Sequence, residues 1–131
     1  AHEPDAGADI RSTAEVIVRP KDSVVIPTGI AVEIPIGYEG QIRSRSGMGF
    51  KEDVVAFHGT VDSGFAGHLQ VKLFNHGYKP FLVSKGDRVA QLVVAPVDLS
   101  KWEEVAEFDL DVENKETIAR GSNGFGSTGV D

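Results

Sequence analysis

The sequence predicts an all-β protein, built as a sandwich or barrel of many short strands. Its apolar residues come mostly in short runs rich in Val and Ile, and several runs alternate with polar residues at the two-residue period of a half-buried strand. Turn-forming residues separate these runs at short intervals, and no alternation of strands with long helices is visible. Together these observations favour antiparallel sheets over a parallel α/β fold.

Five apolar runs define the expected strands, at residues 16–18, 24–26, 30–34, 69–74 and 89–94. Clusters of Pro, Gly, Asp and Asn predict turns at residues 19–22, 27–29, 35–37, 75–78 and 85–87. A helix of one or two turns is expected only between residues 44 and 53. After Pro96 the strand pattern gives way to an acidic connection, and the glycine-rich end from residue 121 onward predicts a flexible tail.

Composition excludes several classes of function. Because the 131 residues include no cysteine, disulfides, a thiolate nucleophile and cysteine-based metal sites are ruled out. The net charge is −7, but residues 103–116 alone hold seven acids and one lysine, which leaves 12 basic and 13 acidic residues elsewhere. Without a broad basic face, we expect no nucleic-acid partner.

No apolar run reaches the roughly 18 residues of a membrane span, so we expect no membrane partner. The first twelve residues have neither a basic region nor an apolar region typical of a secretion signal. We therefore expect a cytoplasmic protein.

The C-terminal tail combines glycines with groups that suit a nucleotide. Its pattern resembles a dinucleotide fingerprint and a P-loop, but no helix can follow it, and the P-loop lysine is replaced by Ser127. The tail still offers a guanidinium (Arg120), hydroxyls (Ser127, Thr128) and a flat ring (Phe125). A disordered end is the alternative, but an isolated ring in a solvated tail favours a lid that stacks on a ligand.

Two internal segments could hold an anion or a reacting water. Residues 43–49 place Arg45, Ser46 and Gly47 in a flexible, hydroxyl-bearing cluster, which suits an anion but could also be an ordinary solvated turn. Residues 59–67 predict a hairpin that presents Asp62 and Phe65, a carboxylate able to activate water and a ring able to pack on a sugar. On local sequence alone, a turn-capping Asp62 and a core Phe65 are the favoured alternative.

The polar residue Gln91 interrupts an apolar run and could simply face outward from a strand. The four histidines show no metal-binding spacing.

Five of these segments together resemble the motifs of the trimeric dUTP pyrophosphatases, or dUTPases, in their order along the chain. The matching segments are AGADIRS (6–12), RSGMG (45–49), GTVDSGFAG (59–67), GDRVAQL (86–92) and RGSNGFGSTG (120–129). The resemblance implies a jelly-roll-like β-barrel domain over residues 1–119 and a nucleotide-closing arm over residues 120–131. It also implies a homotrimer with active sites between subunits.

The resemblance assigns a role to individual residues. It implies that Asp62 activates the attacking water, that Phe65 packs under the deoxyribose, and that Asp9 supports Mg²⁺ through water. Phe65 departs from the usual tyrosine of the family. The remaining substrate-binding residues are implied to contact phosphates (Arg45, Ser46, Gly47, Gln91), the uracil edge through the hairpin backbone (Gly59, Val61, Val71), or the nucleotide from the arm (Arg120, Phe125, Gly126, Ser127, Thr128).

The implied reaction converts dUTP to dUMP and pyrophosphate. Because phosphoryl transfer depends mainly on positioning and charge stabilisation, Mg²⁺ and arginines suffice without a cysteine, serine or histidine nucleophile. Two alternatives remain: a relative of dCTP deaminase with the same fold, and a catalytically silent β-barrel that binds a nucleotide or a protein as a regulator.

Overall fold

Antiparallel strands make up most of the regular secondary structure in the described part of the chain, which confirms the predicted all-β class. The computed structural model describes residues 5–108. Its elements in chain order are β1 (Gly7–Arg11), β2 (Val16–Val18), β3 (Ser23–Ala31), β4 (Tyr38–Arg43), α1 (Ser46–Glu52), β5 (Val54–Ala56), β6 (Gly59–Val61), β7 (His68–Asn75), β8 (Phe81–Val83) and β9 (Arg88–Pro96).

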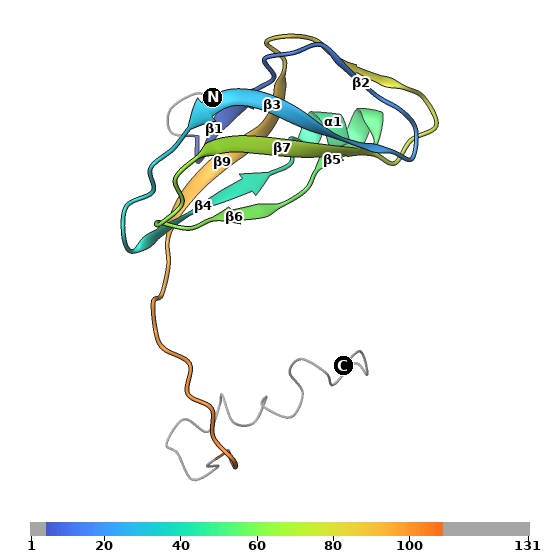
Figure 1. The fold of residues 1–131 in the computed structure, drawn as a ribbon. Coiled ribbons are helices and arrows are strands. Elements are labelled where there is room, and N and C mark those ends of the chain that lie inside the picture. Colours follow the sequence, from blue (N-terminus) through green and yellow to red (C-terminus); the bar gives the residue numbers. More distant parts are fainter. Residues whose placement is uncertain (1–4, 109–131) are drawn as a thin grey trace. The chain divides into compact units, whose positions relative to one another are not determined.

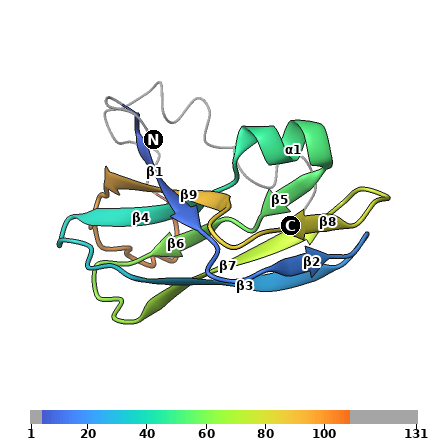
Figure 2. The ribbon, with the colours of Figure 1, turned by 90° about the horizontal axis from the view of Figure 1, so that it is seen from above.

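The strands form three antiparallel sheets. One sheet has four strands in the order β1-β9-β4-β6, a second has three in the order β3-β7-β5, and β2 pairs with β8. Figure 1 shows β3 and β7 running side by side, with β9 between β1 and β4. Seen from above, α1 lies beside β5 at one end of the sheets (Figure 2). Neighbours in a sheet are often distant in sequence, as β1 and β9 are, so widely separated motifs meet.

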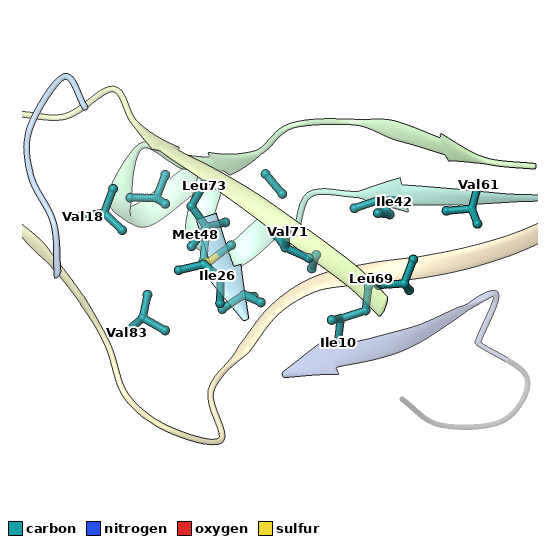
Figure 3. Close-up of a cluster of buried hydrophobic side chains, with 14 of the residues drawn as sticks. Ile10, Val18, Ile26, Ile42, Met48, Val61, Leu69, Val71, Leu73 and Val83 are labelled. Carbon is teal, nitrogen blue, oxygen red and sulfur yellow. The ribbon is translucent and has the colours of Figure 1, made fainter. Parts of the chain in front are cut away.

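The core lies between the inner faces of the sheets. The four-stranded sheet contributes alternate residues of its strands, including Ile10 and Ile42, and the three-stranded sheet contributes Ile26 and Leu73. Met48 adds its side chain from α1, and Figure 3 shows it beside Ile26 and Leu73, with Ile10 and Ile42 toward the other end of the same cluster. Each buried aliphatic side chain contributes about 1.5–3 kcal/mol relative to an exposed one. The outer faces carry exposed side chains of both kinds, polar ones such as Arg43 and apolar ones such as Val25.

The helix expected between residues 44 and 53 is confirmed as α1, and Asp53 ends it in a left-handed conformation with φ 57°. The turn expected at residues 27–29 is wrong. Pro27 and Gly29 lie inside β3, where the pairing with β7 is irregular between Pro27 and Ala31 and Gly29 takes φ 66°. The expected separate strand at 30–34 is therefore the end of β3, followed by irregular chain.

The hairpin expected at residues 59–67 is also wrong as a paired unit. β6 pairs with β4, whereas β7 pairs with β3 and β5, so the two segments belong to different sheets. The hairpin that does form joins β5 to β7, and β6 lies within its long connection. The turn after β6 is still held between two paired strands, β6 and β7.

The chain divides into two units, Ala1–Leu99 and Ser100–Asp131. In the second unit, the described residues 100–108 contain no helix or strand, and the Trp102 side chain is 100% exposed, which confirms an irregular connection after Pro96. The predicted arm at residues 120–131 lies outside the described residues. Within the described part of the chain, no helix is long and apolar enough to cross a bilayer.

Candidate functional site

The outer face of the four-stranded sheet carries a row of polar side chains. Asp9 on β1 lies directly opposite Gln91 on β9, and Gln91 lies opposite Arg43 on β4. Directly opposed residues of antiparallel strands share a face, so these three side chains line up across the sheet. On the other face, Ile10 opposes Ala90, and both are buried in the core. The sheet therefore holds Asp9 and Gln91, two of the predicted site residues, next to each other.

A β-bulge at the start of β9 adds Arg88 to this group. The register shifts between Ile10 and Arg11, and both Val89 and Ala90 are buried although they are consecutive. Because strand side chains alternate, two adjacent buried residues mean that the bulge has turned Arg88 back to the outer face. There the Arg88 guanidinium approaches the Asp9 carboxylate, with 3.7 Å from Nη1 to Oδ2.

The segment before α1 brings in Arg45. Its Nη1 donates to the backbone carbonyl of Arg88 at 3.4 Å, and Arg45 occupies the N-cap position of α1. Ser46 and Gly47 follow in the first turn, both exposed, and no atom lies within 4 Å of a side chain built at Gly47. Ligand atoms could therefore approach the backbone of Gly47 closely. We call Asp9, Arg45, Arg88 and Gln91 the arginine cluster.

A cavity of about 200 Å³ opens beside the arginine cluster. Arg45, Asp87 and Arg88 provide its charged lining, and the apolar remainder includes Met48 and Val89. Two guanidiniums at one small hollow favour a polyanion with several oxygens, because each guanidinium can donate in a bidentate fork. The cationic cavity suits a phosphate chain better than an apolar ligand.

The predicted catalytic segment follows β6 at the far edge of the same sheet. The Phe65 N–H donates to the Asp62 carbonyl at 3.0 Å, which closes a tight turn, and the Asp62 residue is exposed. The Phe65 ring is 42% exposed and lies across Gly67, where an added Cβ would be 3.4 Å from Cζ. The alternative that placed Phe65 in the core is therefore wrong. A half-exposed ring next to an exposed carboxylate is a surface that a ligand can contact.

The side chains of Val61 and Val71 lie in the core, at 6% and 1% exposure. Neither side chain is therefore available to a ligand. The Lys72 carbonyl accepts a hydrogen bond from the Phe57 N–H at 2.8 Å, so the peptide groups of Lys72 face β5. Those of its neighbour Val71 therefore face β3. By the same alternation, the peptide groups of Gln70 face away from β3. Sequence reasoning could not assign these directions, because the alternation depends on which strand pairs with which edge.

A second hollow, of about 260 Å³, lies over β4 and the start of β6. The Arg43 Nε donates to Gln41 Oε1 at 3.1 Å, and Gln41 Nε2 donates to Glu39 Oε1 at 2.5 Å. These hydrogen-bonded side chains line the same hollow as Gly59, the first residue of β6 and a predicted site residue. Their hydrogen bonds hold the polar surface beside Gly59 in place.

Within one chain, the structure brings together the first, second and fourth motifs but not the third. Val61 lies three residues along β4 from the level of Gln91 and two strand spacings away, which amounts to about 14 Å. Asp62 continues beyond Val61, away from the arginine cluster. The predicted arm residues Arg120, Phe125, Gly126, Ser127 and Thr128 lie outside the described residues. Sequence reasoning assigned Arg88 no specific role, although its motif GDRVAQL was singled out.

Metal-binding groups are sparse in the described part of the chain. No three His, Cys, Asp or Glu side chains there gather closely enough to form a metal cage. Asp9 is the carboxylate of the arginine cluster, and its side chain is only 10% exposed. A single nearly buried carboxylate fits Mg²⁺ that keeps most of its waters and phosphate ligands, because Mg²⁺ is commonly bound through one or two carboxylates plus substrate phosphates.

The fold and the cluster define a class: an all-β protein with a cationic hollow for a small polyanion. Comparison with known proteins gives the family. The dUTPase family model matches residues 1–129. The deoxyuridine 5'-triphosphate nucleotidohydrolase of Gloeothece citriformis is 40% identical over 131 residues, which cover 98% of this chain and 86% of that protein. The chain belongs to the dUTPase family.

Solved dUTPase structures are similar to this chain as well. A mutant dUTPase of Staphylococcus bacteriophage 80alpha with dUpNHpp is 33% identical, with a TM-score of 0.82 and coverage of 99% of this chain and 89% of that chain. A mutant dUTPase of phage phi11 of S. aureus, which coordinates a structural Mg(II) ion, is 30% identical, with a TM-score of 0.77 and coverage of 82% and 88%. The jelly-roll-like fold expected from the resemblance is thereby confirmed.

Proposed function

We propose that this chain hydrolyses dUTP to dUMP and pyrophosphate. The observation that carries the proposal is the convergence of three motifs, distant in sequence, on the arginine cluster and its cavity. Arg45 lines the cavity, Gln91 lies opposite Asp9 in the same cluster, and the exposed Ser46 and Gly47 add a hydroxyl and an accessible N–H. Membership of the dUTPase family supports the same substrate.

Asp62 is the proposed catalytic base. Its carboxylate would accept a proton from a water molecule and direct that water at the α-phosphorus, with pyrophosphate as the leaving group. Phe65 would pack under the deoxyribose, where a flat ring leaves no room for a 2′-hydroxyl. The peptide groups of the segment from Gly59 to Val71 would recognise the uracil edge.

We propose that the active site is shared between the chains of a homotrimer. A base must bring its water to within about 3–3.5 Å of the reacting phosphorus. In one chain, Val61 and Gln91 are about 14 Å apart by strand register, and Asp62 lies further still. A second chain that faces the arginine cluster with its own Asp62 turn would close this gap. Residues 120–131 would supply the closing arm, with Arg120, Ser127 and Thr128 on the phosphates, Gly126 beside them and Phe125 over the base.

The described residues fit a magnesium ion that is held mainly by the substrate. Asp9 would hold a water of its hydration shell, and Arg45 would bind phosphate oxygens. When bound, Mg²⁺ neutralises charge that develops on the phosphate chain.

Most of the net negative charge lies in the acidic segment at residues 103–116, and the sequence offers no broad basic surface. The protein is therefore proposed to act on free nucleotides in the cytoplasm, away from nucleic acid and membrane.

Pyrophosphate release tests the proposal, with dUTP, dTTP, dCTP and UTP as separate substrates and Mg²⁺ present. We expect turnover of dUTP far above the other three. Release of uracil nucleotides from dCTP would indicate a deaminase, and binding of dUTP without pyrophosphate would indicate a regulator; either result would contradict the proposal.

The role of Asp62 has its own test. Asp62→Asn removes the proton acceptor while keeping the size of the side chain, so general-base catalysis worth about 10²–10⁴-fold should be lost while dUTP binding persists. Ser63→Ala, next to Asp62, is the matched control. Normal hydrolysis by the Asp62→Asn variant would remove Asp62 from its proposed role.

A further inference from the structure

We propose that Arg88 is a positioning residue that fixes the Asp9 carboxylate for its part in magnesium binding. The proposal rests on the proposed function and extends it to a residue that forms an ion pair with the metal-supporting carboxylate. Its basis is the Arg88–Asp9 ion pair on the outer face of the four-stranded sheet, 3.7 Å between Nη1 and Oδ2.

The backbone at the start of β9 holds Arg88 in place. The Ser12 N–H donates to the Asp87 carbonyl, and the Gly86 N–H donates to the Ser12 carbonyl, both at 2.8 Å. The Arg11 Nη1 adds a bond to the Gly86 carbonyl at 2.9 Å. These bonds anchor the bulge from both strands, so the Cα of Arg88 is fixed relative to β1 and Asp9. A bulge commonly re-aims one side chain next to a functional site.

The burial of the two partners separates their roles. The Asp9 side chain is 10% exposed, whereas the Arg88 side chain is 47% exposed. A carboxylate withdrawn this far from water needs an opposite charge to hold its orientation. Arg88 contributes such a charge, and it lines the cavity together with Arg45. Its guanidinium therefore restrains Asp9 without taking the place of a ligand.

The link to Arg45 extends this restraint to the phosphate-binding side. Arg45 donates to the Arg88 carbonyl, so the bulge is tied to the segment that starts α1. A shift of Arg88 would move the carboxylate and the neighbouring guanidinium together. Partners that orient a metal-binding group typically change metal affinity or activity by about 10- to 100-fold when they are lost.

The test compares Arg88→Gln, Asp9→Asn and the double variant with the wild-type protein. Arg88→Gln should lower kcat about 10- to 100-fold and raise the Mg²⁺ concentration for half-maximal activity. Because Arg88 acts through Asp9, the double variant should be no slower than Asp9→Asn alone, whereas independent effects would multiply. Arg88→Lys should recover part of the loss. Arg19→Gln, an exposed arginine outside the site, controls for lost charge and should match the wild type.

Binding provides a readout that does not depend on turnover. Calorimetry with dUpNHpp should show about tenfold weaker binding by Arg88→Gln with Mg²⁺, and little change in EDTA. Equal weakening in both conditions would mean a direct phosphate contact and overturn the proposal. So would unchanged kinetics, multiplicative effects in the double variant, or an unfolded Arg88→Gln protein. A wild-type protein that is inactive on dUTP would instead contradict the proposed function.

Discussion

Asn75, at the end of β7, connects this strand to β2 and to the turn before β8 through its side chain. The residue is 0% exposed. Its Nδ2 donates to the carbonyls of Val18 and Lys79 at 3.0 and 2.7 Å, and its Oδ1 accepts from the Gly77 N–H at 2.8 Å. Asn75→Ala would remove all three bonds at once, from β2 and from the turn that leads to β8.

The expected cost follows from these bonds. A neutral hydrogen bond contributes about 1 kcal/mol net, and buried backbone groups left without a partner add further desolvation cost, so Asn75→Ala should lower the free energy of unfolding by about 3–4 kcal/mol. With a urea m-value of about 2 kcal/mol/M, the midpoint should fall by about 1.5–2 M. Asn75→Asp, which keeps the acceptor but loses both donors, should be destabilised at least as much.

Urea denaturation followed by far-UV circular dichroism measures this change. Tryptophan fluorescence is a poor probe, because Trp102 is fully exposed in the folded state. Protein concentration must be held constant, since assembly would add to the apparent stability. Lys79→Ala is the matched control: its carbonyl still accepts the bond, and the loss of an exposed side chain should change stability by about 0.5 kcal/mol or less. A loss below 1 kcal/mol for Asn75→Ala would refute the role of the network.

Three further predictions concern the site. Phe65→Tyr should leave the fold and the preference for deoxyribose intact, because Phe65 is 42% exposed and is not packed in the core; discrimination between dUTP and UTP measures this, and a collapse of the fold would contradict it. Deletion of residues 117–131 should leave a folded protein with greatly reduced dUTP turnover, and an unchanged rate would show that the arm is idle. Gly40→Ala should destabilise the protein by about 1–3 kcal/mol, since overpacking is costly and its Cβ would lie 3.2 Å from Ile34, Val61 and Leu92; a thermal midpoint equal to that of the wild type would show that these side chains can move.

Several apolar runs predicted strands from the sequence, but the short runs Val54–Ala56 and Phe81–Val83 and the strands with a single inward residue were missed. The runs at 16–18, 69–74 and 89–94 correspond to β2, β7 and β9. In contrast, β1 contributes only Ile10 to the core, and β4 contributes Ile42 together with the backbone of Gly40. Such strands form because their neighbours pair with them, and local hydrophobicity does not record that pairing.

The turn prediction at residues 27–29 failed for a related reason. Pro-Thr-Gly is typical of a turn, but here Gly29 takes its positive φ inside an irregular stretch of β3. Thr28 is buried, and its hydroxyl donates to the Leu69 carbonyl at 2.6 Å, which holds the irregular strand against β7. A long-range bond to another strand overrode the local preference for a turn.

The candidate site, too, could be predicted only in part from the sequence. The residue types were visible in the sequence, because carboxylates, arginines and glycines in short motifs indicate phosphate chemistry whatever their partners. Their grouping was not visible, since it depends on β9 lying between β1 and β4. The separation of Asp62 from Gln91 follows from that same strand order, and it supports the proposal that the site is shared between chains.

The orientation of Arg88 could not be predicted from the sequence, because it depends on a β-bulge. Regular alternation through Arg88-Val89-Ala90-Gln91 would place Arg88 on the same face as buried Ala90, in the core, where an unpaired guanidinium is very costly. The bulge resolves this conflict by burying Val89 as well, and it turns Arg88 toward Asp9. Two apolar residues between two polar ones are compatible with a bulge in a strand, but only the partner strand decides whether one forms. The same irregularity that hides Arg88 from sequence analysis thus allows it to act on the site.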